Sequence, residues 1–308
     1  MHMGRSVLEM FLIVGLVAGM AAPAWSFLNN KFEKEVEKET GAVKLVREIQ
    51  RGGYDVVTTE ELKKWIDSGK EMLIVDTMPY EDSYKKQHVP GAVQFLFPIP
   101  DMKEWDTNET DGKTMEDFKK LMGDNKEKSI VIYCGFVKCT RSHNGAAWAV
   151  KLGYKNVKVF AEGFPSWMKV AGNYPAVDTE WVKKQIDSQV DMVVIDSRPK
   201  RKKYDKGHIP TAISIPDSKF AKMQDQLPAD KTTPLVFYCG GLKCPLSHKS
   251  AFKAEKLGYT NVKVFAEGFP KYMKVAGNYP AVSVEWVKAQ LDKGAEIAVI
   301  DARPKKKK

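Results

Sequence analysis

Short apolar runs alternate with amphipathic segments along most of the chain. In the clearest stretch, residues 179–186 have helical spacing, and Asp178 or Thr179 is the predicted N-cap. Short apolar runs, each predicted to be a strand, lie at residues 129–133, 192–195, 212–215, 235–238 and 261–265. A second helix is predicted over residues 247–257. Strands that alternate with helices favour an α/β fold with a parallel sheet covered on both faces.

The chain repeats itself at domain length. Residues 151–182 and 256–287 match at 27 of 32 positions, at an offset of 105, and the same offset links Cys134 to Cys239. His88 and His208 are instead 120 apart, so the first copy carries about 15 extra residues (120 minus 105), which we place within residues 98–120. This period is too long for a solenoid unit. We predict tandem domains over residues 54–173 and 174–278, followed by an incomplete third repeat, 279–308, that holds only an opening helix and strand.

The first 26 residues differ in character from the rest. Arg5 precedes an apolar run over residues 10–22, and small residues follow up to Ser26. This pattern predicts a secretory signal peptide over residues 1–26, with an uncleaved membrane anchor as the alternative. Both interpretations predict an exported, periplasmic protein. Residues 27–53 form a charged lead-in that is predicted to be helical.

Composition and charge narrow the class of protein. The chain is 43% hydrophobic and 29% charged, as in globular proteins, and its formal net charge is +10. Basic runs at residues 200–203 and 305–308 are interpreted as solvated faces, or as a field that attracts small anions. Because no nucleic-acid-binding motif accompanies them, no nucleic-acid partner is predicted.

All four cysteines fall in two loops, each of which follows a predicted strand and precedes a predicted helix. Backbone N–H groups in such a loop can form an anion-binding nest, and the helix N-terminus adds partial positive charge. This setting lowers the pKa of a thiol, and the resulting thiolate can attack sulfane sulfur. The predicted anion-binding residues, of which the two lysines are alternatively solvated, are Gly135, Lys138, Arg141, Gly240, Gly241 and Lys243.

This strand–cysteine–loop–helix unit resembles the active-site loop of the rhodanese family. Three further segments of each copy are similar to that family: the strand ends at residues 75–77 and 195–198, the His-x-Pro elements at 88–92 and 208–212, and the Gly-Phe-Pro segments at 163–167 and 268–272. The resemblance implies tandem rhodanese-like domains, each with a central parallel five-stranded sheet flanked by helices. It also implies that Cys134 and Cys239 carry a persulfide, and that His88 and His208 belong to a structural turn.

Both loops depart from the family pattern. A second cysteine, Cys139 or Cys244, stands five residues after the first, Arg141 comes seven after Cys134, and the second loop has no Arg. The second cysteines are interpreted as resolving thiols, as small polar loop residues or as metal ligands. Two thiolates are too few for a zinc site, so neither a metal nor another cofactor is predicted. The departure moves the predicted sulfur donor from thiosulfate toward polysulfide or a protein persulfide.

Several other residues receive structural interpretations. Asp76 and Asp196 end predicted strands and are expected to anchor loops. His143 and His248 are expected to face solvent at helix starts, with tuning of the thiolate as the alternative. The tryptophans of the opening helices are expected to be core residues, namely Trp181 and Trp286.

The leading hypothesis is a sulfurtransferase that moves sulfane sulfur from polysulfide, thiosulfate or a protein persulfide. A persulfide on Cys134, on Cys239 or on both would pass it to a thiol or cyanide. The predicted partners are small sulfur anions and a thiol acceptor, either a small thiol or a thioredoxin-like protein, with a membrane only if the N-terminal segment stays uncleaved. The alternatives are a dithiol–disulfide redox protein that uses both Cys-x4-Cys loops, and a non-catalytic sulfur-binding scaffold. A phosphatase of the same fold is excluded, because the Cys-x5-Arg motif is absent.

Overall fold

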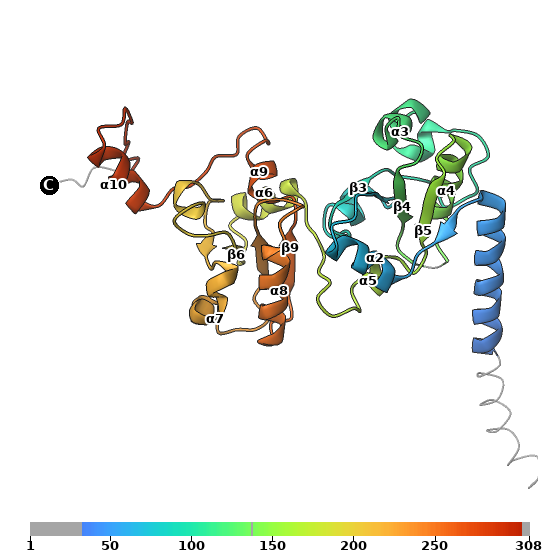
Figure 1. Ribbon diagram of the computed structural model, residues 1–308, viewed down its shortest axis with the longest axis horizontal. Coiled ribbons are helices and arrows are strands. Elements are labelled where there is room, and N and C mark those ends of the chain that lie inside the picture. Colours follow the sequence, from blue (N-terminus) through green and yellow to red (C-terminus); the bar gives the residue numbers. More distant parts are fainter. Residues whose placement is uncertain (1–32, 137, 304–308) are drawn as a thin grey trace, which may run out of the picture. The chain divides into compact units, whose positions relative to one another are not determined.

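The computed structural model describes residues 33–136 and 138–303. The predicted signal segment, 1–26, and the basic run at 305–308 lie outside the described residues. Residues up to Gly53 and residues from Tyr54 onward form two compact units. The described part of the first unit is a mostly exposed helix over residues 33–52 (Figure 1). None of the helices in the described ranges is long and apolar enough to cross a membrane.

The first domain is built on a parallel five-stranded sheet. Its strands are β1 (Asp55–Val56), β2 (Leu73–Asp76), β3 (Ala92–Gln94), β4 (Ser129–Tyr133) and β5 (Asn156–Phe160), in the spatial order β1-β5-β4-β2-β3. In this sheet Val75 lies beside Val93 and Ile132, and Tyr133 lies beside Phe160. Because both faces of the central strands are buried, the apolar runs are continuous rather than alternating.

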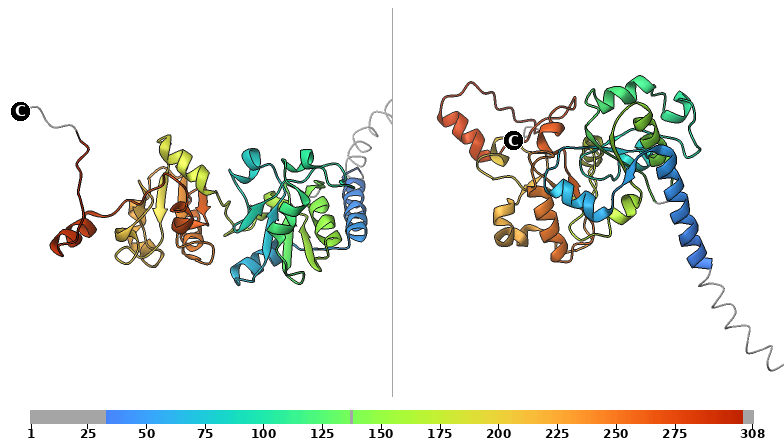
Figure 2. Two further views of the ribbon diagram at one scale, coloured as in Figure 1. Left: turned by 90° about the horizontal axis from the view of Figure 1, so that it is seen from above. Right: turned by 45° about the vertical axis from the view of Figure 1, so that its right-hand side comes forward.

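Helices cover both faces of this sheet (Figures 1 and 2). They are α2 (Thr59–Asp67), α3 (Met115–Met122), α4 (Arg141–Lys151) and α5 (Gly163–Trp167), with a π-helical turn at Tyr80–Tyr84 and a 3₁₀ turn at Thr107–Thr110. On one face Val131 and Tyr133 share a core with Leu62 of α2 and Trp167 of α5. On the other face Ile132 packs so closely on α4 that a Cβ added to Gly145 would lie 3.3 Å from its side chain.

The insert predicted within residues 98–120 packs beside the helix that follows the first cysteine loop. Trp105 stands edge-on to Phe97 and to Trp148 of α4, with ring centres 5.8 and 5.2 Å apart. The side-chain amide of Asn144, also on α4, donates to the carbonyl of Pro98 at 2.9 Å. The start of α4 is therefore fixed by contacts with residues of the insert.

The second domain repeats this layout with the predicted elements. Its strands are β6 (Val193–Asp196), β7 (Ile213–Ser214), β8 (Leu235–Tyr238) and β9 (Val262–Phe265), and its helices are α6 (Thr179–Asp187), α7 (Phe220–Met223), α8 (Leu246–Lys256) and α9 (Gly268–Tyr272). Short 3₁₀ turns lie at Tyr204–Lys206, Asp217–Lys219 and Gln224–Gln226. The side chain of Asp178 accepts a hydrogen bond from the Trp181 N–H at 2.7 Å, so Asp178 is the N-cap of α6. The helices predicted at 179–186 and 247–257 are confirmed within one residue at each end.

The fifth position of the second sheet is filled by a single residue. Four strands pair in the order β7-β6-β8-β9. Ala176 forms a parallel bridge with Val264 of β9, and the Val177 N–H donates to the Val264 carbonyl at 3.0 Å. The predicted parallel α/β architecture is confirmed, with the fifth strand of the second sheet reduced to this bridge.

The third repeat contains one helix, α10 (Val284–Asp292), and none of its residues is buried. Trp181 and Trp286 are both half-buried. Trp181 packs against a core cluster of the second domain, whereas Trp286 lies on a helix with no buried residue, so the assignment of Trp286 to a core is wrong. The strand expected after this helix is also wrong, because residues 295–300 have no regular structure and Ile300 is fully in solvent. A strand needs a hydrogen-bonded neighbour, and the described residues supply none to this segment.

The opening residues of each repeat close the His-x-Pro turn of the preceding domain. His88 and Ala176 exchange two backbone hydrogen bonds of 3.0 and 2.9 Å, and His208 and Ala281 exchange two of 2.9 Å. The N–H of Ser283 also donates to the Asp205 carbonyl at 3.1 Å. The start of the third repeat is therefore part of the second domain's hydrogen-bonded structure.

Ala281→Pro should loosen the second domain at this turn, because proline cannot donate to the His208 carbonyl. One lost backbone hydrogen bond costs about 1 kcal/mol, so we expect roughly fivefold faster amide exchange over residues 204–212. Hydrogen–deuterium exchange with mass spectrometry measures this directly. Ala281→Ser keeps the N–H and should exchange like the wild type. Equal exchange in the two variants would show that the bridge contributes nothing.

Candidate functional site

Each cysteine loop begins at the carboxyl end of a central strand. Cys134 follows β4 and Cys239 follows β8, and α4 or α8 begins at the far end of the loop. Both leading cysteines are almost inaccessible, with 1% and 0% of their surface exposed. In open parallel sheets this edge is where ligands bind, so both sulfurs occupy the expected position for chemistry.

A buried serine lies against each leading cysteine. Ser142 Oγ is 3.2 Å from Cys134 Sγ, and Ser247 Oγ is 3.2 Å from Cys239 Sγ. A hydroxyl can accept a proton from a thiol or donate one to a thiolate, so it suits both charge states of the sulfur. No role was predicted for these serines from the sequence. A signal was present, because both serines stand eight residues after the leading cysteine and keep the offset of 105.

The Gly-Phe-Pro segment supports the backbone of each loop. The Phe164 N–H donates to the Cys134 carbonyl at 3.2 Å, and the Phe269 N–H donates to the Cys239 carbonyl at 3.1 Å. Gly163 has a φ of +70°, and a Cβ there would lie 2.7 Å from the Cys134 carbonyl oxygen. Only glycine fits this position, since any side chain would force the cysteine loop to move.

In the first loop the surroundings favour a negative charge on the second cysteine. The Cys134 thiol donates to the backbone carbonyl of Cys139 at 3.3 Å. The Cys134 side chain above all, and also the backbone N–H groups of Arg141 and Gly135, lower the pKa of Cys139 to about 6. The Cys139 side chain, followed by burial, raises the pKa of Cys134. The expectation of a depressed pKa at the leading cysteine is therefore wrong for the reduced loop. The N–H groups of Gly135 and Arg141 serve the loop's own second sulfur.

The second loop has the same outline and a different charge balance. Burial first, and then the hydrogen bond to Cys244, raises the pKa of Cys239 to about 11. Cys239 Sγ lies 3.0 Å from the Cys244 carbonyl oxygen, to which its thiol donates, and Cys244 itself is half-buried. Leu246 stands where the first loop has Arg141, so this loop lacks that positive charge.

The predicted anion-binding residues are not equivalent in the structure. Lys138 and Lys243 are exposed on the loops. The guanidinium of Arg141 donates to the backbone carbonyl of Phe97, so its contribution to the loop sulfur is through the backbone and through its charge. Gly240 is exposed, and Gly241 has a φ of +115°. Anion binding by this group of residues stays a prediction.

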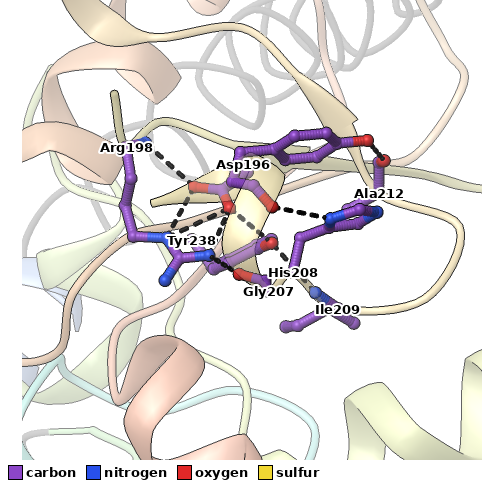
Figure 3. A network of polar contacts seen from close by, with 8 residues as sticks. Asp196, Arg198, Gly207, His208, Ile209, Ala212 and Tyr238 are labelled. Atoms are coloured by element: carbon purple, nitrogen blue, oxygen red, sulfur yellow. Dashed lines mark hydrogen bonds and ion pairs between the residues drawn. The ribbon is translucent and has the colours of Figure 1, made fainter. Parts of the chain in front are cut away.

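A buried carboxylate anchors the second domain's site. Figure 3 shows Arg198 and Tyr238 pointing toward Asp196, which accepts from Arg198 Nη2 at 2.6 Å and from the Tyr238 hydroxyl at 2.7 Å. Arg198 Nη2 also donates to the Gly207 carbonyl at 2.8 Å. The Tyr238 hydroxyl accepts from the Ile209 N–H at 3.1 Å. The network joins the strand end to the His-x-Pro turn, as expected for a loop-anchoring carboxylate.

The first domain keeps this carboxylate and lacks the arginine. Asp76 accepts from the Tyr133 hydroxyl at 2.6 Å and from the Met78 N–H at 2.8 Å, and Met78 replaces Arg198. Without a cation beside it, burial raises the pKa of Asp76 to about 7. The Met78 methyl lies 3.4 Å from the position that a Cβ on Gly135 would take. The first cysteine loop therefore packs against the thioether side chain of Met78.

The histidines act in the framework of the domains. The Nδ1 atoms of His88 and His208 lie 2.8 and 2.9 Å from the carbonyls of Tyr84 and Tyr204, in line with a structural turn. His143 is buried, and its Nδ1 lies 2.8 Å from the Tyr54 hydroxyl, so the expected solvent position is wrong. His248 is partly buried as well, and burial lowers its pKa to about 4. Within residues 33–136 and 138–303, no three His, Cys, Asp or Glu side chains gather as metal ligands would.

Asp76 should make the stability of the first domain depend on pH. Its pKa is about 7 in the folded domain and ordinary in the unfolded chain, so its stabilising contribution is present at low pH and is lost as the pH rises through 7. Met78→Arg recreates the Asp196–Arg198 pair and keeps the carboxylate ionised. We expect its advantage over the wild type in urea unfolding to be about 2 kcal/mol greater at pH 8 than at pH 5. Met78→Gln is the uncharged control, and an identical pH trend in both variants would refute the assignment.

Gly163→Ala should disrupt the first cysteine loop. Gly153 provides a matched control, because its φ is +90° while a Cβ there meets nothing within 4 Å. Both alanine variants carry the strain of a positive φ, about 1 kcal/mol, and only Gly163→Ala adds the clash with the Cys134 carbonyl. We expect it to be less stable than Gly153→Ala by about 2 kcal/mol in urea unfolding. Equal losses of stability in the two variants would mean that the cysteine loop can move away from the added Cβ without a cost in free energy.

Comparisons with known proteins agree with this layout. The sequence model of the rhodanese-like domain matches residues 58–170 and 178–274, which is more than half of the chain. A search of curated protein sequences found no match.

Solved structures similar to the chain include the BH2092 protein from Bacillus halodurans, which is 29% identical over 35% of this chain and 74% of that one (TM-score 0.30). A thiosulfate sulfurtransferase from Pseudomonas aeruginosa is 18% identical, with 78% of this chain and 47% of that one covered (TM-score 0.29). Wild-type EanB is 18% identical, with 76% and 63% covered (TM-score 0.32).

Rhodanese-like domains are generally found in sulfurtransferases. Because the family model matches both repeats and each repeat forms its own parallel sheet, this chain belongs to the rhodanese-like domain family and contains two such domains in tandem.

Proposed function

We propose that this protein transfers sulfane sulfur through a persulfide on Cys134, on Cys239 or on both. One observation carries the proposal. In each domain a buried cysteine ends the central strand, with its sulfur 3.2 Å from a buried serine hydroxyl and hydrogen-bonded to the second cysteine of its loop. A thiol in this position has a hydrogen-bond acceptor for its proton before the reaction. It also has a hydroxyl that can donate to the negatively charged sulfur after the reaction.

The first step is attack by the leading cysteine on the donor. In the first loop the Cys134 thiol donates to the Cys139 carbonyl at 3.3 Å, and the pKa of the neighbouring Cys139 thiol is lowered. As Cys134 Sγ bonds to the terminal sulfur of a polysulfide, its proton passes to Cys139. The donor's S–S bond breaks, and the shortened polysulfide leaves with the electron pair. The product is a Cys134 persulfide beside a neutral Cys139 thiol.

The character of the loops favours polysulfide or a protein persulfide as the donor. Thiosulfate ends in a charged sulfonate group, which calls for a positive side chain aimed at the loop. The guanidinium of Arg141 is bound to the Phe97 carbonyl, and Leu246 takes its place in the second domain. Most atoms of a polysulfide chain are apolar, polarisable sulfur. Its binding therefore depends less on a positive side chain at the loop.

The proposal includes the acceptor and the compartment. The acceptor is a thiol, either a small molecule or a thioredoxin-like protein, with cyanide as a laboratory substitute. The location outside the cytoplasm rests on the signal-like sequence of residues 1–26, and attachment to a membrane would require that segment to stay uncleaved.

Dithiol–disulfide exchange without sulfur transfer is a second candidate, and the hydrogen bond between Cys134 and Cys139 is the observation that favours it. This function predicts turnover with dithiols and disulfides in the absence of any sulfane donor. It also predicts that Cys139→Ser and Cys244→Ser abolish activity, whereas sulfur transfer to an external acceptor survives both substitutions.

Cys134→Ser and Cys239→Ser test the main proposal. Each protein is incubated with polysulfide, thiosulfate or mercaptopyruvate, desalted, and digested for mass spectrometry. At the earliest times, before the second cysteine can react with the persulfide, we expect the peptide of an intact loop to gain the mass of one sulfur atom, and the substituted loop to gain none. Removal of both leading cysteines should lower transfer to cyanide by about 10²-fold or more.

The double variant Cys139→Ser/Cys244→Ser retains both leading cysteines. Without Cys139 to take the Cys134 proton it should gain sulfur more slowly than the wild type, and it should still gain it. If no donor adds sulfur to the leading cysteine of any protein, the proposed function is wrong.

A further inference from the structure

The second cysteine of the first loop already contacts the atom that would become the inner sulfur of a persulfide. Cys139 is 5% exposed, and its backbone carbonyl accepts a hydrogen bond from Cys134 Sγ at 3.3 Å. The backbone N–H groups of Gly135 and Arg141 stabilise its thiolate. Cys139 is therefore fixed next to the reactive sulfur by contacts from both ends of the loop.

We propose that Cys139 discharges the Cys134 persulfide as sulfide and closes a Cys134–Cys139 disulfide. This inference rests on the proposed function, because it needs the persulfide as its starting point. It gives the first domain a second activity, the reduction of sulfane sulfur to sulfide, in which no external acceptor is required for a single turnover.

The step balances with the groups that are present. Cys139 Sγ attacks Cys134 Sγ and forms the disulfide bond. The bond from Cys134 Sγ to the outer sulfur breaks, and its electron pair leaves with that sulfur. The proton of the Cys139 thiol goes to the departing sulfur, which is released as hydrosulfide. The two cysteines together lose two electrons, and the sulfane sulfur gains them. A dithiol, either dithiothreitol or a protein dithiol, then reduces the disulfide and restores the loop.

The geometry and the leaving groups both direct the attack to the inner sulfur. In the reduced loop Cys139 contacts Cys134 Sγ through its backbone carbonyl, at 3.3 Å. Attack on the outer sulfur would have to expel Cys134 as a thiolate, and burial together with its hydrogen bond to Cys139 makes that thiolate strongly basic. Exchange is faster when the leaving sulfur is the less basic one, which here is sulfide.

The backbone donors of the loop reinforce this outcome. In the reduced loop, the N–H groups of Gly135 and Arg141 are directed at Cys139. A persulfide terminus on Cys134 must share these donors with the Cys139 sulfur, so it gains less stabilisation than it would in a loop with a single cysteine. A persulfide with a poorly stabilised terminal sulfur is higher in free energy, so it is shorter-lived beside the Cys139 thiol.

The second domain provides an internal comparison. Cys244 is half-buried, whereas Cys139 is buried, and Leu246 replaces Arg141, whose charge helps to hold the Cys139 thiolate. We expect the Cys239 persulfide to discharge more slowly and to persist for transfer to an external thiol.

A single-turnover experiment on the full chain tests the inference. Reduced protein is freed of reductant, mixed with limiting polysulfide in the absence of oxygen, and quenched at intervals. Released sulfide is trapped with monobromobimane, and the mass of the peptide that spans residues 134–139 is measured by mass spectrometry. In the wild type we expect sulfide release to match the formation of the Cys134–Cys139 disulfide.

Cys139→Ser should keep the persulfide on Cys134 and release sulfide at least about 10-fold more slowly from the first loop, because the intramolecular attack is lost. Cys244→Ser is the matched control and should leave the discharge of the first loop unchanged. Cys139→Ala serves as a second variant if the serine variant fails to fold, as judged by its circular dichroism.

The outcomes separate this inference from the proposed function. If neither the wild type nor the Cys139 variants gain sulfur on Cys134, the proposed function fails. If the persulfide forms and is equally long-lived with and without Cys139, only the inference fails. A disulfide that forms without an equivalent of sulfide would also overturn it, because that result means simple oxidation of the two thiols.

Discussion

In both domains, the carbonyl of the leading cysteine accepts a hydrogen bond from the Gly-Phe-Pro segment, at a point where the glycine leaves no room for a Cβ. Much of the site depends on this contact. It fixes the peptide that follows the strand, so that the sulfur of Cys134 or Cys239 turns inward toward the buried serine. The preceding glutamates, Glu162 and Glu267, tie the same segment to the first helix of their domains through Thr59 and Thr179.

The two domains share this framework and differ in the charges placed around it. The second domain pairs its strand-end carboxylate with Arg198, whereas the first leaves Asp76 without a cation. In the loops the difference is reversed, because the first has Arg141 beside its second cysteine and the second has Leu246. Each domain therefore holds one arginine near its site, in a different place. The two sulfurs can differ in reactivity although their backbones are nearly the same.

Periodicity was enough to predict most of the fold. Apolar runs such as 235–238 predict buried strands because they are too short for a buried helix, and Asp178 precedes a helical pattern that it caps. The repeat located both cysteine loops. The distribution of charge within the loops could not be predicted, because it depends on where the Gly135 and Arg141 N–H groups point. His143 was misplaced because its partner, Tyr54, is 89 residues away.

The fate of a persulfide depends on whether the neighbouring thiol or an outside acceptor reaches it first. Cys139 is held against Cys134 by the fold, so it reacts without any cost of bringing two molecules together. An outside acceptor must diffuse to a sulfur that is almost fully buried. The first loop is therefore built for internal discharge, unless an acceptor moves the loop aside on binding. In the second loop Cys244 is half-buried and has no counterpart of Arg141 to stabilise its thiolate, so an external thiol competes on better terms. A single chain with two nearly identical loops can thus send sulfane sulfur to two products, sulfide and a new persulfide.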